Sequence, residues 1–174
     1  LLRQKLMKLS AYAGQVKMLV LDVDGTFTDG GMYYGPEGEA LKKFNTRDAH
    51  GLQLLRKNGI GVCVMSSENS PAVAARMKKL GIDEYYPGVN DKLAQLKELA
   101  KGKGIALQDI AYIGDDLCDL ACLEHVGFAC CPADAVPEVL QKARYVCEHS
   151  AGHGAVREVC DLIVKMKNSG QMTA

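Results

Sequence analysis

The chain has 174 residues, of which 48% are hydrophobic and 24% charged, and its 21 basic and 21 acidic side chains give no net charge at pH 7. This length suits one domain, over residues 1–174, that can bury a core of its own. The neutral balance gives no signature for nucleic acid or an anionic membrane, and no apolar run reaches the roughly 18 residues of a membrane span. We therefore expect neither nucleic acid nor a membrane as a partner.

Seven cysteines are scattered along the chain without the spacing of a disulfide framework. Their odd number favours reduced thiols that serve as small apolar residues. We therefore expect a reducing compartment, the cytoplasm or the nucleus. Because the sequence begins with Leu1 rather than Met, we also expect a trimmed chain or a piece of a longer one.

Hydrophobic runs rich in β-branched residues alternate with amphipathic stretches. This alternation is typical of βαβ units, so we predict an α/β fold with a doubly wound, Rossmann-like parallel sheet. In chain order, the predicted elements are a helical lead-in at 1–12, a strand at 16–23, a hairpin at 31–44, a helix at 48–58, a strand at 60–66, helices at 71–80 and 92–101, a strand at 110–113, a helix at 117–125, a strand at 127–130, a helix at 136–142, a strand at 144–146, a helix at 155–167 and a frayed tail at 168–174.

The hairpin interrupts the alternation directly after the first strand. Its turn is Gly35-Pro36-Glu37-Gly38, and the runs on either side contain apolar side chains, among them Met32, Tyr33 and Tyr34. Such side chains and unpaired strand edges favour association with another chain. The alternative is a flap that lies on its own domain.

Two predicted strands end in acidic residues. The first strand meets Asp22 and Asp24, and the strand at 110–113 is followed by Asp115, Asp116 and Asp119. Parallel strands present their carboxyl ends at one edge of a sheet, where such folds bind ligands. A polar turn explains the first pair, and helix capping explains one or two of the others, but five neighbouring carboxylates would repel one another. A hard divalent cation resolves this repulsion, and Mg²⁺ is the ion that this ligand set favours.

Two further residues fit an anion site at the same edge. Ser66 ends a strand just before a helix and offers a hydroxyl and backbone N–H groups. Lys92 opens a helix, which is electrostatically the wrong end for a cation, so its placement there is more informative than that of a solvated lysine.

The ordered motifs Asp22-Val-Asp24-Gly-Thr26, Ser66, Lys92 and Gly114-Asp115-Asp116-Leu-Cys-Asp119 resemble those of the haloacid dehalogenase superfamily of phosphatases. The resemblance implies that Asp22 attacks phosphorus to form an aspartyl-phosphate, and that Asp24 acts as general acid and base. Ser66 and Lys92 would hold the phosphoryl oxygens. The residues that it assigns to Mg²⁺ are Asp22, the Asp24 carbonyl and Asp115, with Asp116 and Asp119 orienting the water ligands of the ion or Lys92.

Five stretches narrow the resemblance: Thr28 to Gly31, Lys43 to Asp48, Gly88 to Lys92, Tyr112 to Leu117 and Gly154 to Val159. In these the chain resembles the capless, tetrameric sugar-acid phosphatases of that superfamily. Only about 20 residues separate Gly25 from Asn45, too few for a cap domain with its own core. The resemblance implies a homotetramer in which neighbouring subunits complete the site. It also implies that the segment after the hairpin contacts the sugar acid, namely Asn45, Thr46, Arg47, Asp48 and Ala49, although Arg47 also reads as a solvated arginine at a helix start.

The residues after Ser66 separate two branches of these phosphatases. The octulosonate 8-phosphate enzymes carry Thr-Gly-Arg at this motif, whereas this chain has Ser66-Ser67-Glu68, and the nononate 9-phosphate enzyme has glutamate there. Arg76 and Lys79 also match the nononate pattern, although Arg76 could be an ordinary helix arginine. We therefore expect a sialic-type, nine-carbon sugar acid 9-phosphate, with 3-deoxy-D-manno-octulosonate 8-phosphate as the alternative.

Three further features are the opening sequence Leu1-Leu-Arg-Gln-Lys-Leu6, the Ser67-Glu68 pair and the closing stretch from Tyr145 to Val159. In these the chain is similar to the C-terminal domain of animal-type N-acylneuraminate cytidylyltransferases. In some of these enzymes that domain serves in tetramerisation and lacks key aspartates. A non-catalytic oligomerisation domain, which would allow a nuclear location, is therefore a second hypothesis. The complete aspartate set of this chain favours an enzyme.

Overall fold

The computed structural model describes residues 11–171 and is built on a six-stranded, wholly parallel sheet. The strand order is β5-β4-β1-β6-β7-β8, so β1 lies between its two partners in the middle of the sheet. The strands are β1 (Met18–Leu21), β4 (Gly61–Met65), β5 (Tyr85–Tyr86), β6 (Ile110–Ile113), β7 (Phe128–Cys131) and β8 (Tyr145–Val146).

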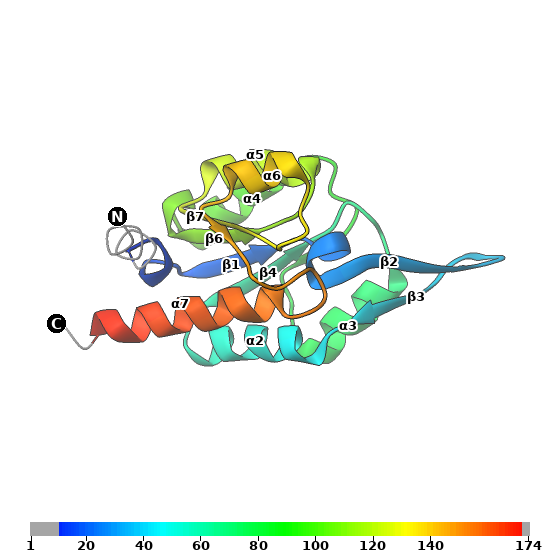
Figure 1. Ribbon diagram of the computed structural model, residues 1–174, viewed down its shortest axis with the longest axis horizontal. Coiled ribbons are helices and arrows are strands. Elements are labelled where there is room, and N and C mark those ends of the chain that lie inside the picture. The colour runs from blue at the N-terminus through cyan, green and yellow to red at the C-terminus, as the bar shows by residue number, and fades with distance from the viewer. Residues whose placement is uncertain (1–10, 172–174) are drawn as a thin grey trace.

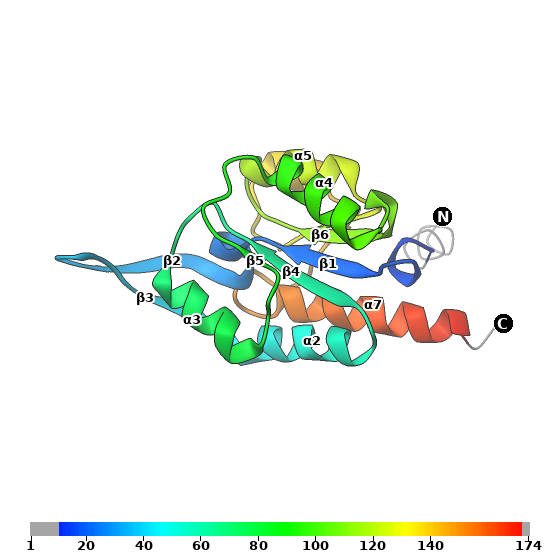
Figure 2. The same cartoon turned by 180° about the vertical axis from the view of Figure 1, so that it is seen from behind.

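Helices cover both faces of the sheet, as Figures 1 and 2 show. One face carries α2 (Thr46–Lys57), α3 (Pro71–Leu80) and α7 (Ala155–Gln171). The other carries α4 (Lys92–Lys103), α5 (Leu120–His125) and α6 (Pro137–Lys142). This arrangement confirms the predicted doubly wound α/β fold.

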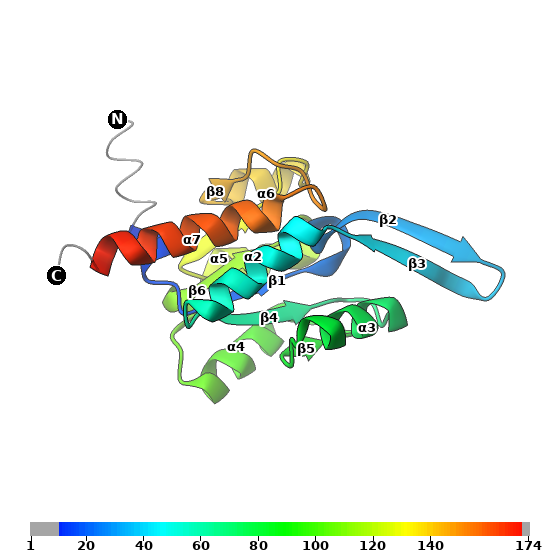
Figure 3. The same ribbon diagram turned by 90° about the horizontal axis from the view of Figure 1, so that it is seen from below.

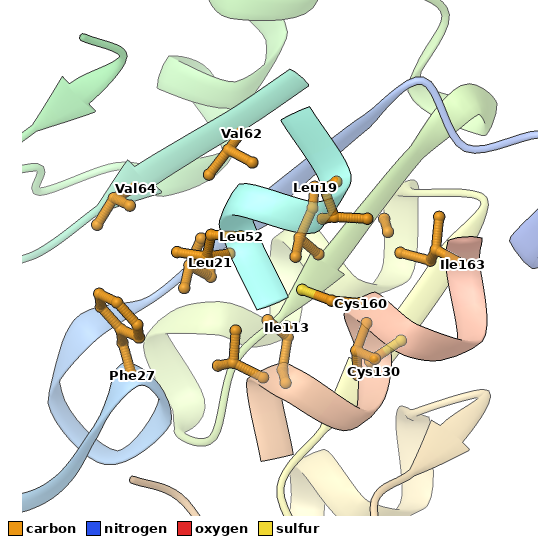
Figure 4. Close-up of a cluster of buried hydrophobic side chains, with 14 of the residues drawn as sticks. Leu19, Leu21, Phe27, Leu52, Val62, Val64, Ile113, Cys130, Cys160 and Ile163 are labelled. Atoms are coloured by element: carbon orange, nitrogen blue, oxygen red, sulfur yellow. The ribbon is translucent and has the colours of Figure 1, made fainter. Parts of the chain in front are cut away.

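The alternation of side chains along each strand divides the core into two clusters. Leu19 and Leu21 of β1 belong to the cluster with α2 and α7, and Figure 4 shows them beside Leu52, Cys160 and Ile163. The intervening strand positions join a second cluster with α4, α5 and α6, which includes Val20, Met65, Leu96, Tyr112 and Cys122. Each buried aliphatic side chain contributes about 1.5–3 kcal/mol to stability. The two clusters thereby fix the strands whose ends form the site.

Several predicted boundaries differ from the observed ones. The first strand stops at Leu21 rather than residue 23, because the chain turns out of the sheet at Gly25, whose φ is +89°. The helix predicted at 117–125 is a one-turn helix over Leu117–Asp119 followed by α5. The two-residue strand β5 was missed because so short a run carries no periodicity.

The termini differ from the prediction as well. Residues 11–14 are helical, and the rest of the expected lead-in lies outside the described residues. The tail was expected to fray from residue 168, but α7 continues to Gln171, and residues 172–174 lie outside the described part.

The hairpin consists of β2 (Thr28–Gly35) and β3 (Gly38–Phe44), and it projects from the body of the molecule (Figures 1 and 3). At its base, Phe44 packs edge-on against buried Phe27, with 5.3 Å between ring centroids. Farther out, its large apolar side chains are exposed, up to 71% for Tyr34. The expectation of a hairpin here is therefore confirmed.

The seven cysteines are free thiols and six are buried, as predicted, whereas Cys118 is exposed beside the site described below. Among residues 11–171, no helix is both long and apolar enough to cross a membrane.

Candidate active site

Three carboxylates meet at the carboxyl edge of the sheet. β1 and β6 pair in parallel, with Leu21 beside Ile113, so the residues that follow them leave the sheet together. Carboxylate oxygens of Asp22, Asp115 and Asp119 lie within 4.8 Å of one another. The structure therefore brings together two motifs that are far apart in the sequence.

Lys92 is the cation among these acids. It is the first residue of α4, whose N-cap is Asp91, and its side chain is almost fully buried. Its Nζ lies 2.5 Å from Asp22 Oδ1 and 2.7 Å from Asp119 Oδ1. Burial alone would lower the pKa of Lys92, but these two carboxylates raise it above its ordinary value. Lys92 is therefore charged and fixed beside Asp22.

Asp119 is fully buried, and both of its oxygens are occupied by donors. Oδ1 accepts hydrogen bonds from Lys92 and from the Tyr112 hydroxyl at 2.7 Å, whereas Oδ2 accepts from the backbone N–H groups of Asp115 and Asp116. Asp119 thus orients Lys92 and the acidic loop, which leaves Asp22 and Asp115 as the better placed ligands for a cation. The role of Tyr112 was missed because a tyrosine in an apolar strand reads as a core residue.

Burial and mutual repulsion raise the pKa values of two of these carboxyl groups. Burial, followed by the charge of Asp119, raises the pKa of Asp22 well above its ordinary value. Burial also raises the pKa of Asp115 to about 6, although the Thr26 hydroxyl, 2.8 Å from Asp115 Oδ1, opposes the shift. Three carboxylates face one ammonium, so the group carries a formal charge of about −2 that one divalent cation would neutralise. The all-oxygen donor set fits Mg²⁺.

Gly25 allows the first acidic loop to approach Asp115. A Cβ built on Gly25 would lie 2.1 Å from Asp115 Oδ2, closer than any side chain tolerates. Its positive φ is also one that glycine adopts without strain. The sequence Asp-Gly-Thr therefore serves both the turn and the packing of the carboxylates.

The Asp24 side chain contacts the hairpin. Its carboxylate pairs with Nζ of Lys42, which also lies 3.2 Å from Glu39. Burial alone would lower the pKa of Lys42, but the two carboxylates raise it. Nothing in the sequence distinguishes Lys42 from the neighbouring Lys43, so this contact was missed.

Ser66 lies at the same edge, after β4, which pairs with β1 on its other side. It is buried, and its Oγ accepts a hydrogen bond of 3.0 Å from the backbone N–H of Glu68. Glu68 itself is exposed in the loop that leads to α3. Ser66 thus lies at the same sheet edge as the acidic group, and Glu68 follows it in the loop.

The segment after the hairpin, which we expect to contact the sugar acid, contains both exposed and buried residues. Thr46 and Arg47 are exposed at the start of α2, and Asn45 caps this helix by accepting from Arg47 N at 2.8 Å. Asp48 and Ala49 are buried within the chain, and contact of either residue with the substrate stays a prediction.

Asp48 instead holds the start of α7. Its carboxylate accepts hydrogen bonds from the backbone N–H groups of Arg157, at 2.9 Å, and Gly154, at 3.3 Å. Because both donors are otherwise unpaired at a helix N-terminus, the aspartate satisfies them in the way a cap does.

The remaining predicted residues lie outside the acidic group. The Arg76 guanidinium carbon is 5.7 Å from the centre of the Phe44 ring at the hairpin base. Lys79 is exposed in the last turn of α3, about 12 Å along the helix from its first residue. Asp116 is exposed and caps the one-turn helix by accepting from Leu117 N at 2.6 Å. Asp116 also borders the group around Asp22 because its backbone N–H donates to Asp119 Oδ2, whereas Arg76 and Lys79 belong to α3.

Comparisons with known proteins agree with this geometry. The model of the haloacid dehalogenase-like hydrolase family matches residues 86–159. The 3-deoxy-D-manno-octulosonate 8-phosphate phosphatase KdsC of Escherichia coli (strain K12) is 40% identical over 154 residues, which are 88% of this chain and 82% of that protein.

Two solved structures are similar over nearly their whole length. The 3-deoxy-D-manno-octulosonate 8-phosphate phosphatase of Yersinia pestis has a TM-score of 0.90 at 38% identity and covers 94% of this chain and 89% of its own. The enzyme of the same name from Moraxella catarrhalis has a TM-score of 0.90 at 37% identity, covers 95% of both chains, and is in complex with magnesium ion, phosphate ion and a KDO molecule. That complex and the acidic group described above support Mg²⁺ as the cofactor. The chain therefore belongs to the haloacid dehalogenase-like hydrolases and is a phosphoric monoester hydrolase.

Proposed function

We propose that this chain is a Mg²⁺-dependent phosphatase that removes phosphate from a 3-deoxy-2-ulosonic sugar acid through an aspartyl-phosphate at Asp22. The observation that carries the proposal is the Asp22 carboxylate, held by Lys92 at 2.5 Å and accompanied by Asp115 at the sheet edge. A carboxylate with a fixed cation on one side and a cation-binding partner on the other can attack a phosphoryl group without electrostatic rejection.

Each residue has a part in the proposed reaction. Asp22 attacks phosphorus, and Asp24 protonates the departing sugar oxygen and later takes a proton from the attacking water. Lys92 and the Ser66 hydroxyl bind the phosphoryl oxygens, while Asp119 keeps Lys92 in place. When bound by Asp22, Asp115 and the Asp24 carbonyl, Mg²⁺ offsets the negative charge of the phosphoryl group.

We favour a sialic-type, nine-carbon sugar acid 9-phosphate as the substrate. Glu68 supports this choice because it is exposed two residues after Ser66, where its carboxylate can accept hydrogen bonds from sugar hydroxyls or an N-acyl group. A second candidate, 3-deoxy-D-manno-octulosonate 8-phosphate, is favoured by the names of the relatives. An arginine at this position would instead favour a carboxylate, so Glu68 is where the two candidates separate.

We further propose a homotetramer in which the hairpin contacts neighbouring subunits. The hairpin exposes Met32, Tyr33, Tyr34 and Leu41, the last at 64%, and exposed apolar side chains grouped on a projecting element mark an association surface. We keep Arg47, Arg76 and Lys79 as proposed substrate-binding residues.

The decisive experiment is a phosphate-release assay with both sugar-acid phosphates, run with Mg²⁺ and with a chelator. We expect Mg²⁺-dependent release and a higher kcat/KM for the nine-carbon 9-phosphate. A clear preference for the octulosonate phosphate would support the second candidate. Absence of release from either phosphate, in a protein of tetrameric mass, would instead favour the non-catalytic oligomerisation domain.

A further inference from the structure

Lys42 links the hairpin to the carboxyl edge of the sheet. It belongs to β3, which projects from the body, yet its side chain is 0% exposed. Its Nζ pairs with the Asp24 carboxylate and lies 3.2 Å from Glu39. An ammonium withdrawn from water is costly unless it is paired, so these two carboxylates determine where Lys42 lies.

An irregularity in the hairpin ladder aims Lys42 and Glu39 to the same side. Tyr33 pairs with Leu41, whereas the next residue, Tyr34, pairs with Glu39, which leaves one extra residue in β3. In a regular strand, residues three apart face opposite sides. A bulge of one residue reverses this relation, which is how such features redirect side chains near active sites.

The contact continues from Glu39 into the body of the protein. Glu39 accepts a hydrogen bond from the buried Ser70 hydroxyl, and Ser70 is the N-cap of α3, where its Oγ accepts from Val73 N at 3.4 Å. Lys42 is thus held from behind by a residue anchored to a helix. The path runs from Asp24 through Lys42 and Glu39 to Ser70.

We propose that Lys42 is a positioning residue for Asp24. Its ammonium donates a hydrogen bond to Oδ1 of Asp24 and so fixes the direction of the carboxyl group, whose other oxygen, Oδ2, carries the proton that passes to the leaving oxygen. The inference rests on the function proposed above, in which Asp24 is the general acid. It adds that a hairpin residue outside the four sequence motifs sets the geometry of this step.

Two substitutions at residue 42 and one at residue 43 distinguish the positioning of Asp24 from a general effect of losing a positive charge on the hairpin. Lys42→Met removes the ammonium but keeps most of the chain length, and Lys42→Arg keeps a positive charge. Lys43→Met is the matched control because it removes the same charge from the next residue, which is 54% exposed and pairs with Asp29 instead. Lys42→Gln is a second neutral variant should Lys42→Met fail to fold, as judged by its melting temperature.

The readout compares two leaving groups in the full-length protein. The preferred sugar-acid phosphate needs a proton on its departing oxygen, whereas p-nitrophenyl phosphate releases a stabilised phenolate and needs far less help. For Lys42→Met, we expect kcat on the sugar-acid phosphate to fall about tenfold or more, with KM within about twofold and a smaller loss on p-nitrophenyl phosphate. Lys42→Arg should recover part of kcat, and Lys43→Met should match the unsubstituted protein.

Equal losses on both substrates would overturn the positioning role, and so would an unchanged kcat in a folded Lys42 variant. The proposed function fails in a different way: the unsubstituted protein would then release no phosphate, or Asp22→Asn would release as much. That result would overturn this inference together with the function on which it rests.

Discussion

The carboxyl edge of the sheet and the hairpin are joined by the turn after β1, but they differ in how far their side chains are exposed to solvent. At the edge, Asp119 is buried with every oxygen engaged, and Lys92 is pinned between two acids. On the hairpin, Tyr34 and Leu41 are exposed. The first region is built for chemistry that needs fixed charges, and the second for contact with something outside the chain. Lys42 is where the two regions meet.

Asp22→Asn tests the edge most severely. The amide removes the nucleophile but nearly keeps the shape of the side chain, so we expect phosphate release to fall at least about a thousandfold with the fold intact. A Mg²⁺-dependent phosphatase assay measures the loss, and the melting temperature checks the fold. Near-normal turnover in this variant would contradict the assignment of the edge as the catalytic region.

Gly25→Ala tests whether close packing at the edge is required. The new Cβ would meet Asp115, and the positive φ would strain alanine by about 1–2 kcal/mol. We expect kcat to fall about tenfold to a hundredfold, with a lower melting temperature. Gly38→Ala, in the hairpin turn, is the matched control, because it also has a positive φ but its Cβ would have nothing within 4 Å. Equal activity losses in the two variants would remove the distinction between the regions.

Leu41→Glu tests the hairpin as an association surface. A charge at this exposed position should shift the oligomer to a smaller mass, measured by light scattering, with little change in the stability of the body. Val146→Glu, at an exposed apolar residue of β8, provides the control for adding a charge elsewhere. If the control dissociates the oligomer and Leu41→Glu does not, the association surface lies on the body instead.

Glu158→Gln tests the contacts between α7 and the segment 145–149, and it has the smallest expected effect. Burial raises the pKa of Glu158, but hydrogen bonds from Tyr145, Glu148 N and His149 outweigh burial and hold that pKa below its ordinary value. Because the folded pKa is lowered, the ionised group stabilises the fold above about pH 4.3, the usual value for glutamate, and this stabilisation is lost as pH falls through the folded pKa.

We therefore expect Glu158→Gln to lower the melting temperature at pH 7, by an amount that shrinks in acid. Glu148→Gln, at the exposed neighbour, should show little difference at either pH. A melting difference between Glu158→Gln and the unsubstituted protein that stays constant from neutral to acid pH would contradict the assigned role of the carboxylate.

Most of the fold could be predicted because its signals are local. Hydrophobic strands and amphipathic helices are repeated patterns, and the helix at 71–80 was predicted to the residue from its Ser70-Pro71 start. The two-residue strand β5 and the division of the helix at 117–125 were missed. Both features are too short to change the periodicity of hydrophobic residues along the sequence.

For the site, the sequence predicted acids and a lysine that the structure brings together at the sheet edge, and resemblance supplied the roles proposed for them. It did not reveal that the Asp48 carboxylate accepts hydrogen bonds at the start of α7, because those donors are distant in the sequence. It also missed Tyr112 and Lys42, whose partners are distant in sequence.

The sequence by itself determined the parallel α/β fold and the charged residues that follow its strands, because both are short patterns of residue type. Tertiary structure alone decided the partners of those charges. Asp119 is saturated with donors, Asp48 caps a helix, and Lys42 reaches Asp24 from a projecting hairpin. The reason is that ion pairs and hydrogen bonds act over a few ångströms in space, and only the packed sheet and its helices determine which side chains come within that distance.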